Sequence, residues 1–192
     1  RREILMLVLT PMMLSFVAVG VFFKLFYEPT FGLLSQAYSY FSGEPLTLLA
    51  TQWGAVWGIV IADAWMWSPF VMLLVLAGLV SVPDYLYEAA EVDRASKWKR
   101  FTTVTFPYVR GLLLLALLFR TIETFKIFDV VYLITNGGPG TSTETIAVYV
   151  YRVAFQFFKT SQSSALSYIL LFIVIVLTNL YLYFVKKRGE EG

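Results

Sequence analysis

Two residue types that carry much of protein chemistry are absent from this chain. Its 192 residues contain no cysteine and no histidine. A disulfide framework, a thiol nucleophile and a zinc site made of Cys and His ligands are therefore excluded within it. The same absence excludes a Ser-His-Asp triad and the zinc motif H-E-x-x-H.

Charged residues are also scarce. They make up 15% of the chain, whereas hydrophobic residues make up 58%. Soluble domains carry about a quarter charged and about half apolar residues, so this composition predicts a membrane protein with the lipid bilayer as a partner. The net charge of +2 gives no reason to expect nucleic acid as a partner.

A phosphate-binding loop is missing as well. The glycine cluster at residues 136–140 lacks the Gly-Lys-Ser/Thr that grips phosphate and magnesium. We therefore expect this chain to bind no cofactor itself, so any ATP chemistry must come from a partner.

Long apolar runs indicate helices that cross a bilayer, which needs about 20 apolar residues per crossing. The expected fold is all-α: a polytopic helical membrane bundle forming one domain over residues 1–192. We expect four spans at about residues 4–24, 57–82, 109–134 and 165–185. No signal peptide precedes the first run, and we expect upstream spans to be missing.

Basic residues are unevenly divided between the two sides that four spans define. One side holds ten of them (Arg1, Arg2, Arg94, Lys97, Lys99, Arg100, Arg110, Lys186, Lys187 and Arg188) and the other three (Lys24, Arg152 and Lys159). The positive-inside rule then makes residues 84–108 and both ends cytoplasmic. On the outer side we expect short interfacial helices within residues 24–49. Residues 145–158 form either a surface helix or a re-entrant element, and periodicity does not decide between them.

The cytoplasmic loop at residues 84–108 has the pattern of two short helices joined by a turn. Pro83 and Asp84 suit a helix start, and a second helix is expected from near Ala95 to just before Pro107. The loop is either a solvated connection or a docking element. An apolar stripe at helical spacing, formed by Leu86, Ala89 and Ala90, favours docking.

At these residues the chain resembles a known family. The pattern consists of Glu88, Ala89, Ala90, Asp93, Ala95, Phe101 and Pro107. It resembles the EAA loop in permease subunits of binding-protein-dependent carbohydrate ABC importers, closest to the maltose and glycerol-3-phosphate branch. The similarity extends to residues 63–70, 118–123, 128–129, 136–145 and 151–155, and so covers nearly the whole chain.

The resemblance implies an ATP-driven sugar importer of a bacterial inner membrane, in which this chain is not an enzyme. Its partners would be a second permease subunit, two ATP-binding subunits carrying ATP and Mg²⁺, and an external substrate-binding protein. The loop would be the coupling helix, with Glu88 paired to a basic residue of the ATP-binding subunit. Ala89 and Ala90 would permit close approach.

One residue departs from the family pattern. Arg94 stands where the family usually has glycine after the loop aspartate. Glycine there permits a turn with positive φ, a conformation that costs arginine about 1 kcal/mol. Either the turn differs here or the strain is tolerated.

Ionisable residues within spans are functional candidates because they are costly there. Asp63, with Trp65 and Trp67, is expected either to line a sugar path or to lie at the outer interface with the tryptophans as an anchoring belt. Arg120, Glu123, Lys126 and Asp129 alternate in sign every third residue. They form either a salt-bridge ladder or a wall of the path.

Helix geometry limits how many of these four charges can share a cavity. Three-residue spacing drifts by about 60° per step, so we expect that not all of them face one cavity. Glu123 and Asp129 are the two that we select as path residues.

Three alternatives stay open. One is the same machinery importing glycerol phosphate or a polyol, for which more basic path residues would be expected. An ATP-independent channel would need no ATP-binding subunit. An intramembrane enzyme would use Asp63 and Asp129 as a carboxylate pair, although no motif supports it.

Overall fold

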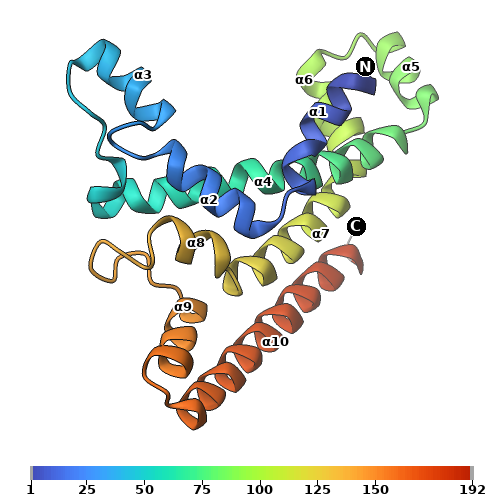
Figure 1. Cartoon of the computed structure of the whole chain (residues 1–192). Coiled ribbons are helices and arrows are strands. Elements are labelled where there is room, and N and C mark those ends of the chain that lie inside the picture. The colour runs from blue at the N-terminus through green and yellow to red at the C-terminus, as the bar shows by residue number, and fades with distance from the viewer. Residues whose placement is uncertain (1, 191–192) are drawn as a thin grey trace.

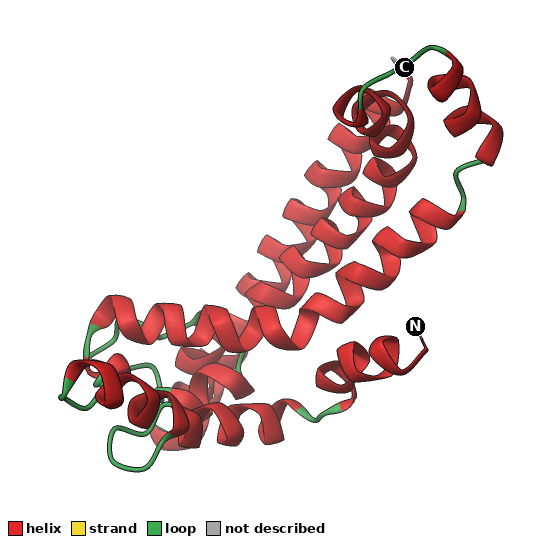
Figure 2. Ribbon diagram, turned by 90° about the horizontal axis from the view of Figure 1, so that it is seen from above, coloured by secondary structure: helices red, strands yellow, loops and turns green. Residues whose placement is uncertain are grey.

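The computed structural model describes residues 2–190, with side chains at 2, 4, 5, 184 and 186–190 left out. Every regular element in that range is helical, as Figures 1 and 2 show, which confirms the all-α prediction. Five of the basic side chains used for the topology prediction (Arg1, Arg2, Lys186, Lys187 and Arg188) lie outside the described set.

Within the described residues, three helices are long and apolar enough to cross a membrane by length and composition. They are α4 (Gln52–Val80), the continuous run Lys97–Phe125, and α10 (Thr160–Glu190), whose apolar part is Thr160–Tyr183. α4 covers the second predicted span except for its last two residues, and α10 contains the fourth. With the bent pair described next, the chain reaches up to four spans.

The first predicted span is not one straight helix. α1 (Arg2–Met13) and α2 (Phe16–Phe26) meet at a bend of 102°. Pro11 lies near the end of α1, where its ring and missing N–H disfavour continuation. Ser15 then has an extended backbone, and its hydroxyl accepts a hydrogen bond from the Ala18 amide at 3.1 Å. This is an N-cap, which starts a new helix in a new direction.

The helix expected to stop before Pro107 instead runs through it. α6 (Lys97–Arg100) passes into a π-helical turn, Phe101–Thr105, and then into α7 (Phe106–Phe125). A proline removes one backbone donor and clashes with the carbonyl four residues earlier. The wider π turn, in which the Phe106 amide donates to the Phe101 carbonyl, lets the helix continue.

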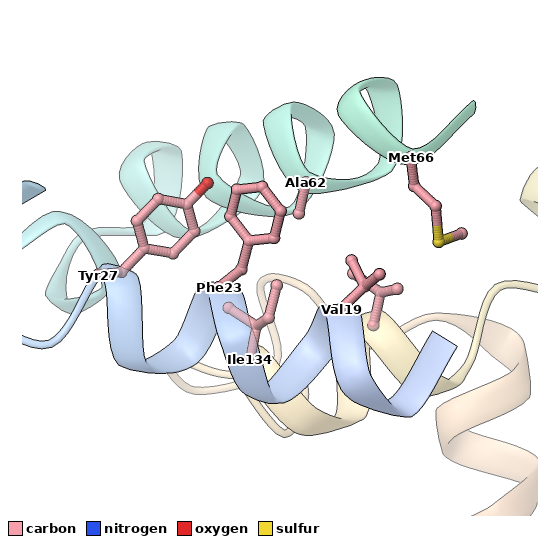
Figure 3. Close-up of a cluster of buried hydrophobic side chains, with 7 residues drawn as sticks. Val19, Phe23, Tyr27, Ala62, Met66 and Ile134 are labelled. Carbon is pink, nitrogen blue, oxygen red and sulfur yellow. The ribbon is translucent and has the colours of Figure 1, made fainter. Parts of the chain in front are cut away.

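The third predicted span ends nine residues early. α7 stops at Phe125, and residues 129–134 form a separate short helix, α8 (Asp129–Ile134), which packs on α2. Figure 3 shows the resulting core between α2, α4 and α8. Its buried members are Val19, Phe23, Tyr27, Ala62, Met66, Val130 and Ile134.

Two contacts show how closely these helices approach. A Cβ on Gly20 would lie 2.8 Å from the Cβ of Leu133, so only glycine fits α2 against α8 there without a shift. The Tyr27 hydroxyl donates to the Gly58 carbonyl at 2.9 Å and ties α2 to α4.

The short elements gather at two opposite ends of the long helices. α5 (Asp84–Val92) and α6 lie together at one end in Figures 1 and 2. α3 (Leu33–Ser42), the 3₁₀ turn η1 (Leu48–Ala50), the glycine-rich loop (residues 136–145) and α9 (Ile146–Tyr151) lie towards the other. The loop at 84–108 therefore lies at the end opposite α3 and the glycine-rich loop.

Candidate functional site

A small polar cavity lies between α4, α7 and α8. Its volume is about 90 Å³. Five charged side chains line it, together with Phe16, Trp67 and Phe128: Asp63, Arg120, Glu123, Lys126 and Asp129. We call this space the polar cavity.

The central feature of the polar cavity is an ion pair between two helices. Arg120 on α7 donates a short hydrogen bond to the carboxylate of Asp63 on α4. The two side chains are 18% and 20% exposed. The guanidinium carbon also lies 4.7 Å from the centre of the Trp67 ring. Arg120 is therefore held by a carboxylate and by an aromatic face, two independent attractions.

The predicted ladder along one helix is replaced by this cross-helix pair. Only Glu123 and Lys126 pair locally, at 2.7 Å. The expectation that the four charges would not share a cavity was wrong, because they do not belong to one helix. α7 ends at Phe125, and Asp129 starts α8 after a turn of the chain.

The polar cavity brings together four of the five predicted path residues: Asp63, Trp67, Glu123 and Asp129. Trp65 is elsewhere. Its ring stacks on Phe22 at 6.2 Å and meets Phe23 edge-on at 5.4 Å, so it packs α4 against α2. Arg120 and Lys126 were not selected from the sequence. The available signal was that Arg120 and Asp63 are opposite charges in neighbouring spans.

A second cavity of about 270 Å³ adjoins the first. Asp63 and Ile127 line both, and the second is otherwise lined by apolar side chains of α4 and by Thr124, Thr143 and Thr145. We call it the threonine cavity. The pair of Asp63 with Arg120 therefore stands at the boundary between the two spaces.

Hydrogen bonds fix the glycine-rich loop that carries Thr143 and Thr145. Arg152 donates to Glu144 at 2.6 Å and to the carbonyl of Asn136. The Thr143 hydroxyl donates to the Gly138 carbonyl at 2.7 Å, and Thr145 donates to the Ile127 carbonyl at 3.0 Å. Similarity to the family indicated these residues, but it did not predict the two hydrogen bonds that Arg152 donates.

The loop at the opposite end forms the predicted helix–turn–helix. α5 ends at Val92, and Arg94 has φ of +52°, the conformation that favours glycine. The turn therefore has the backbone conformation that glycine favours, and Arg94 adopts it despite the strain. The Ala95 amide donates to the Ala90 carbonyl at 2.9 Å. Ser96 then caps α6 by accepting from the Lys99 amide at 3.2 Å.

Two contacts hold α5 against the long helix that begins with α6. The hydroxyls of Tyr87 and Thr105 are 3.0 Å apart, and Arg100 approaches Glu91 at 3.9 Å. The predicted contact residues Glu88, Ala89, Asp93 and Arg94 are exposed, as are Phe101 and Pro107, whereas Ala90 and Ala95 are half-buried. Large apolar side chains beside them are also exposed, including Val92 (83%) and Trp98 (73%).

These features define a class of protein. Long apolar helices, a cavity lined by paired charges and an exposed helical hairpin describe a polytopic helical membrane protein. Asp63, one of the two carboxylates considered for catalysis, is engaged by Arg120.

The family follows from comparison with known proteins. Residues 1–189 match the model described as "Binding-protein-dependent transport system inner membrane component", and the chain belongs to that family. This confirms the resemblance read from the EAA pattern.

Several relatives have names that describe permeases for sugars or sugar derivatives. The chain is 36% identical over 170 residues to the trehalose/maltose transport system permease protein MalF of Thermococcus litoralis, a match covering 87% of this chain and 56% of the relative. It is 33% identical to the sulfoquinovosyl glycerol transport system permease protein SmoG of Agrobacterium fabrum, covering 94% of this chain and 58% of the relative. The chain thus spans little more than half the length of these relatives.

Solved structures share the fold. A chain of a bacterial alginate ABC transporter, crystallised with its alginate pentasaccharide-bound periplasmic protein, matches with a TM-score of 0.84 at 21% identity. The match covers 94% of this chain and 63% of that chain. A second structure, of a bacterial ABC transporter involved in the import of the acidic polysaccharide alginate, matches with a TM-score of 0.81 at 19% identity, covering 97% of this chain and 65% of that one.

Proposed function

We propose that this chain is part of the membrane-spanning subunit of an ATP-driven sugar importer. The observation that carries the proposal is the exposed hairpin of α5 and α6, which bears the EAA pattern at the end opposite α3 and the glycine-rich loop. An exposed apolar surface with few internal contacts is typical of a docking element.

The hairpin is the docking site for an ATP-binding subunit. Glu88 is exposed on α5 and has free access to a basic partner, while Ala89 leaves room for a facing backbone. Val92 and Trp98 supply apolar area that water would otherwise contact. ATP and Mg²⁺ bind to the partner subunits, and closure of those subunits is transmitted through the hairpin.

The remaining partners follow from the family. A second permease subunit completes the path, and a substrate-binding protein delivers sugar to the end that carries α3, the glycine-rich loop and α9. The hairpin and both ends of the chain face the cytoplasm of a bacterial inner membrane. The neighbour crystallised with its periplasmic protein and the sugar permeases among the relatives support this assembly.

The path runs past the polar cavity. Carboxylates accept hydrogen bonds from sugar hydroxyls, and the Trp67 ring offers an apolar face to a pyranose. Asp63, Trp67, Glu123 and Asp129 are the side chains of this chain that we assign to it. Trp65 is assigned to packing between α4 and α2 instead.

Co-purification tests the docking site. The full-length protein is tagged, expressed with its genomic neighbours and purified from detergent-solubilised membranes. We expect an ATP-hydrolysing subunit to accompany it and Glu88→Lys to release that subunit, because the reversed charge opposes a basic partner. Glu44→Lys, an exposed carboxylate at the other end, is the matched control and should leave the complex intact.

The three possible results of the co-purification lead to different conclusions. Loss of the ATPase in the Glu88 variant alone establishes the docking site. Retention of a functional ATPase by that variant contradicts it. A protein that purifies without any ATPase would instead favour an ATP-independent channel.

A further inference from the structure

Asp63, the acidic member of the ion pair, lines two cavities. The polar cavity holds about 90 Å³ and the threonine cavity about 270 Å³. Binding sites for small molecules usually measure about 300–1,000 Å³. Neither cavity reaches that range alone, so a solute of that size would extend across both and meet Asp63, which lines each of them.

We propose that this pair determines selectivity by charge: it admits uncharged, hydroxyl-bearing solutes and rejects anionic ones. The inference rests on the proposed transport function and adds which solutes pass. The fold leaves this question open, since one solved neighbour belongs to an importer of an acidic polysaccharide.

The first step of the argument is the chemistry of a hydroxyl group. A hydroxyl both donates and accepts hydrogen bonds, whereas a guanidinium only donates and an ionised carboxylate only accepts. A sugar hydroxyl between the two can accept from Arg120 and donate to Asp63. Both charges remain satisfied when the ion pair opens.

An anionic solute cannot do the same. Its carboxylate would take Arg120 and leave Asp63 without its partner, in a position where both side chains are about four-fifths covered. Breaking a buried pair by removing one partner is costly, because it leaves an uncompensated charge. A cationic solute meets the mirror-image penalty at Arg120.

The other charges in the polar cavity act in the same direction. Its lining holds three carboxylates (Asp63, Glu123 and Asp129) and two cations (Arg120 and Lys126), a formal excess of one negative charge. Lys126 is already paired with Glu123 at 2.7 Å. No surplus cation therefore remains in the lining to receive an anion.

Trp67 holds Arg120 in place while the ion pair is open. Its ring lies 4.7 Å from the guanidinium carbon of Arg120, an attraction that does not depend on Asp63. Arg120 therefore stays at the cavity when its carboxylate partner turns to a solute.

The test measures saccharide binding to the full-length transporter complex without its external binding protein, so that protein's own selectivity does not enter. The probes are trehalose, maltose and a disaccharide that carries a uronic acid. The binding of each is measured by isothermal titration calorimetry. We expect the wild-type complex to bind a neutral disaccharide at least about tenfold more tightly than the acidic one. Asp63→Asn should shift that ratio by about tenfold or more towards the acid, because it frees Arg120.

Two variants complete the test. Glu44→Gln removes an exposed carboxylate outside both linings and should leave the ratio unchanged, because Arg120 stays engaged. The exchange Asp63→Arg with Arg120→Asp keeps a pair and should restore the neutral preference, which covers the case that Asp63→Asn fails to assemble.

The outcomes separate the two claims. Wild-type preference for the acid, or a ratio that Asp63→Asn leaves unchanged, overturns the selectivity role while sugar transport stands. A wild-type complex that binds none of the three saccharides contradicts the proposed sugar path, and the selectivity role with it.

Discussion

The middle of α4 and the hairpin beyond its carboxyl end are built in opposite ways. Around the polar cavity, α2, α4, α7 and α8 bury apolar side chains and pair Arg120 with Asp63. At the hairpin of α5 and α6, Glu88 and Trp98 are exposed and few contacts hold the element. Side chains in the first region pack within this chain, whereas under the proposed function those in the second contact another chain. Substitutions in the first should therefore cost stability, and those in the second should cost assembly.

The largest stability effect is expected from Arg120→Ala. It leaves Asp63 without its partner and removes the contact with Trp67. Breaking a fully buried pair costs about 3–5 kcal/mol, and the partial exposure here reduces our expectation to about 2 kcal/mol. Thermal unfolding in detergent should then show a Tm lower by roughly 4–8 °C.

Lys126→Ala is the control for this experiment. Lys126 and Glu123 are 53% and 37% exposed, and such pairs contribute about 1 kcal/mol or less. Equal losses in the two variants would contradict the central place given to the cross-helix pair.

A smaller loss is expected from Gly20→Ala. The new Cβ meets Leu133 at 2.8 Å and forces α2 away from α8. Overpacking costs about 1–3 kcal/mol, and alanine regains about 1 kcal/mol of helix propensity. The net loss should be about 1 kcal/mol in the same unfolding measurement.

Gly111→Ala provides the matched comparison. Nothing lies within 4 Å of a Cβ at Gly111 on α7, so this variant should be neutral or slightly more stable. If Gly20→Ala proves just as harmless, α2 and α8 do not pack as closely as described.

The smallest effect is expected at the hairpin turn. Arg94→Gly relieves about 1 kcal/mol of backbone strain in the folded state. It also raises the conformational entropy of the unfolded chain, which lowers stability by a similar amount. Its stability should change by less than about 0.5 kcal/mol, with the ATPase still bound. Arg94→Val should lower the free energy of unfolding by about 1 kcal/mol, because a β-branched residue fits positive φ poorly. A stable, fully coupled Val variant would show that the turn differs.

Sequence patterns predicted those features that depend on composition and local order. Apolar runs indicated the long helices, and the sequence around Glu88 predicted the hairpin. The sequence left open whether Arg94 takes positive φ, and the structure gives it +52°. These signals are local, because each rests on neighbouring residues.

Features that depend on contacts between distant segments were not predictable. The bend after α1 depends on two residues together, because Pro11 disfavours continuation of α1 and Ser15 caps the start of α2. Neither residue alone predicts a bend. The break after Phe125 interrupts an apolar run, so hydropathy continued the helix to residue 134. Arg120 had acidic neighbours on its own segment, and only the packing of α7 on α4 selects Asp63, 57 residues away.

The π turn at Phe101–Thr105 has a mechanical consequence. Because it carries the helix past Pro107, the segment from Lys97 to Phe125 is one rod. At 1.5 Å per residue, Lys97 and Arg120 lie about 35 Å apart along it. A tilt of about 5° imposed where Trp98 meets a partner would move the guanidinium of Arg120 by roughly 3 Å, by the geometry of a rod of that length. That displacement matches the reach of a hydrogen bond, so in the proposed importer a tilt of this size at the hairpin would be enough to part the ion pair at the other end of the rod.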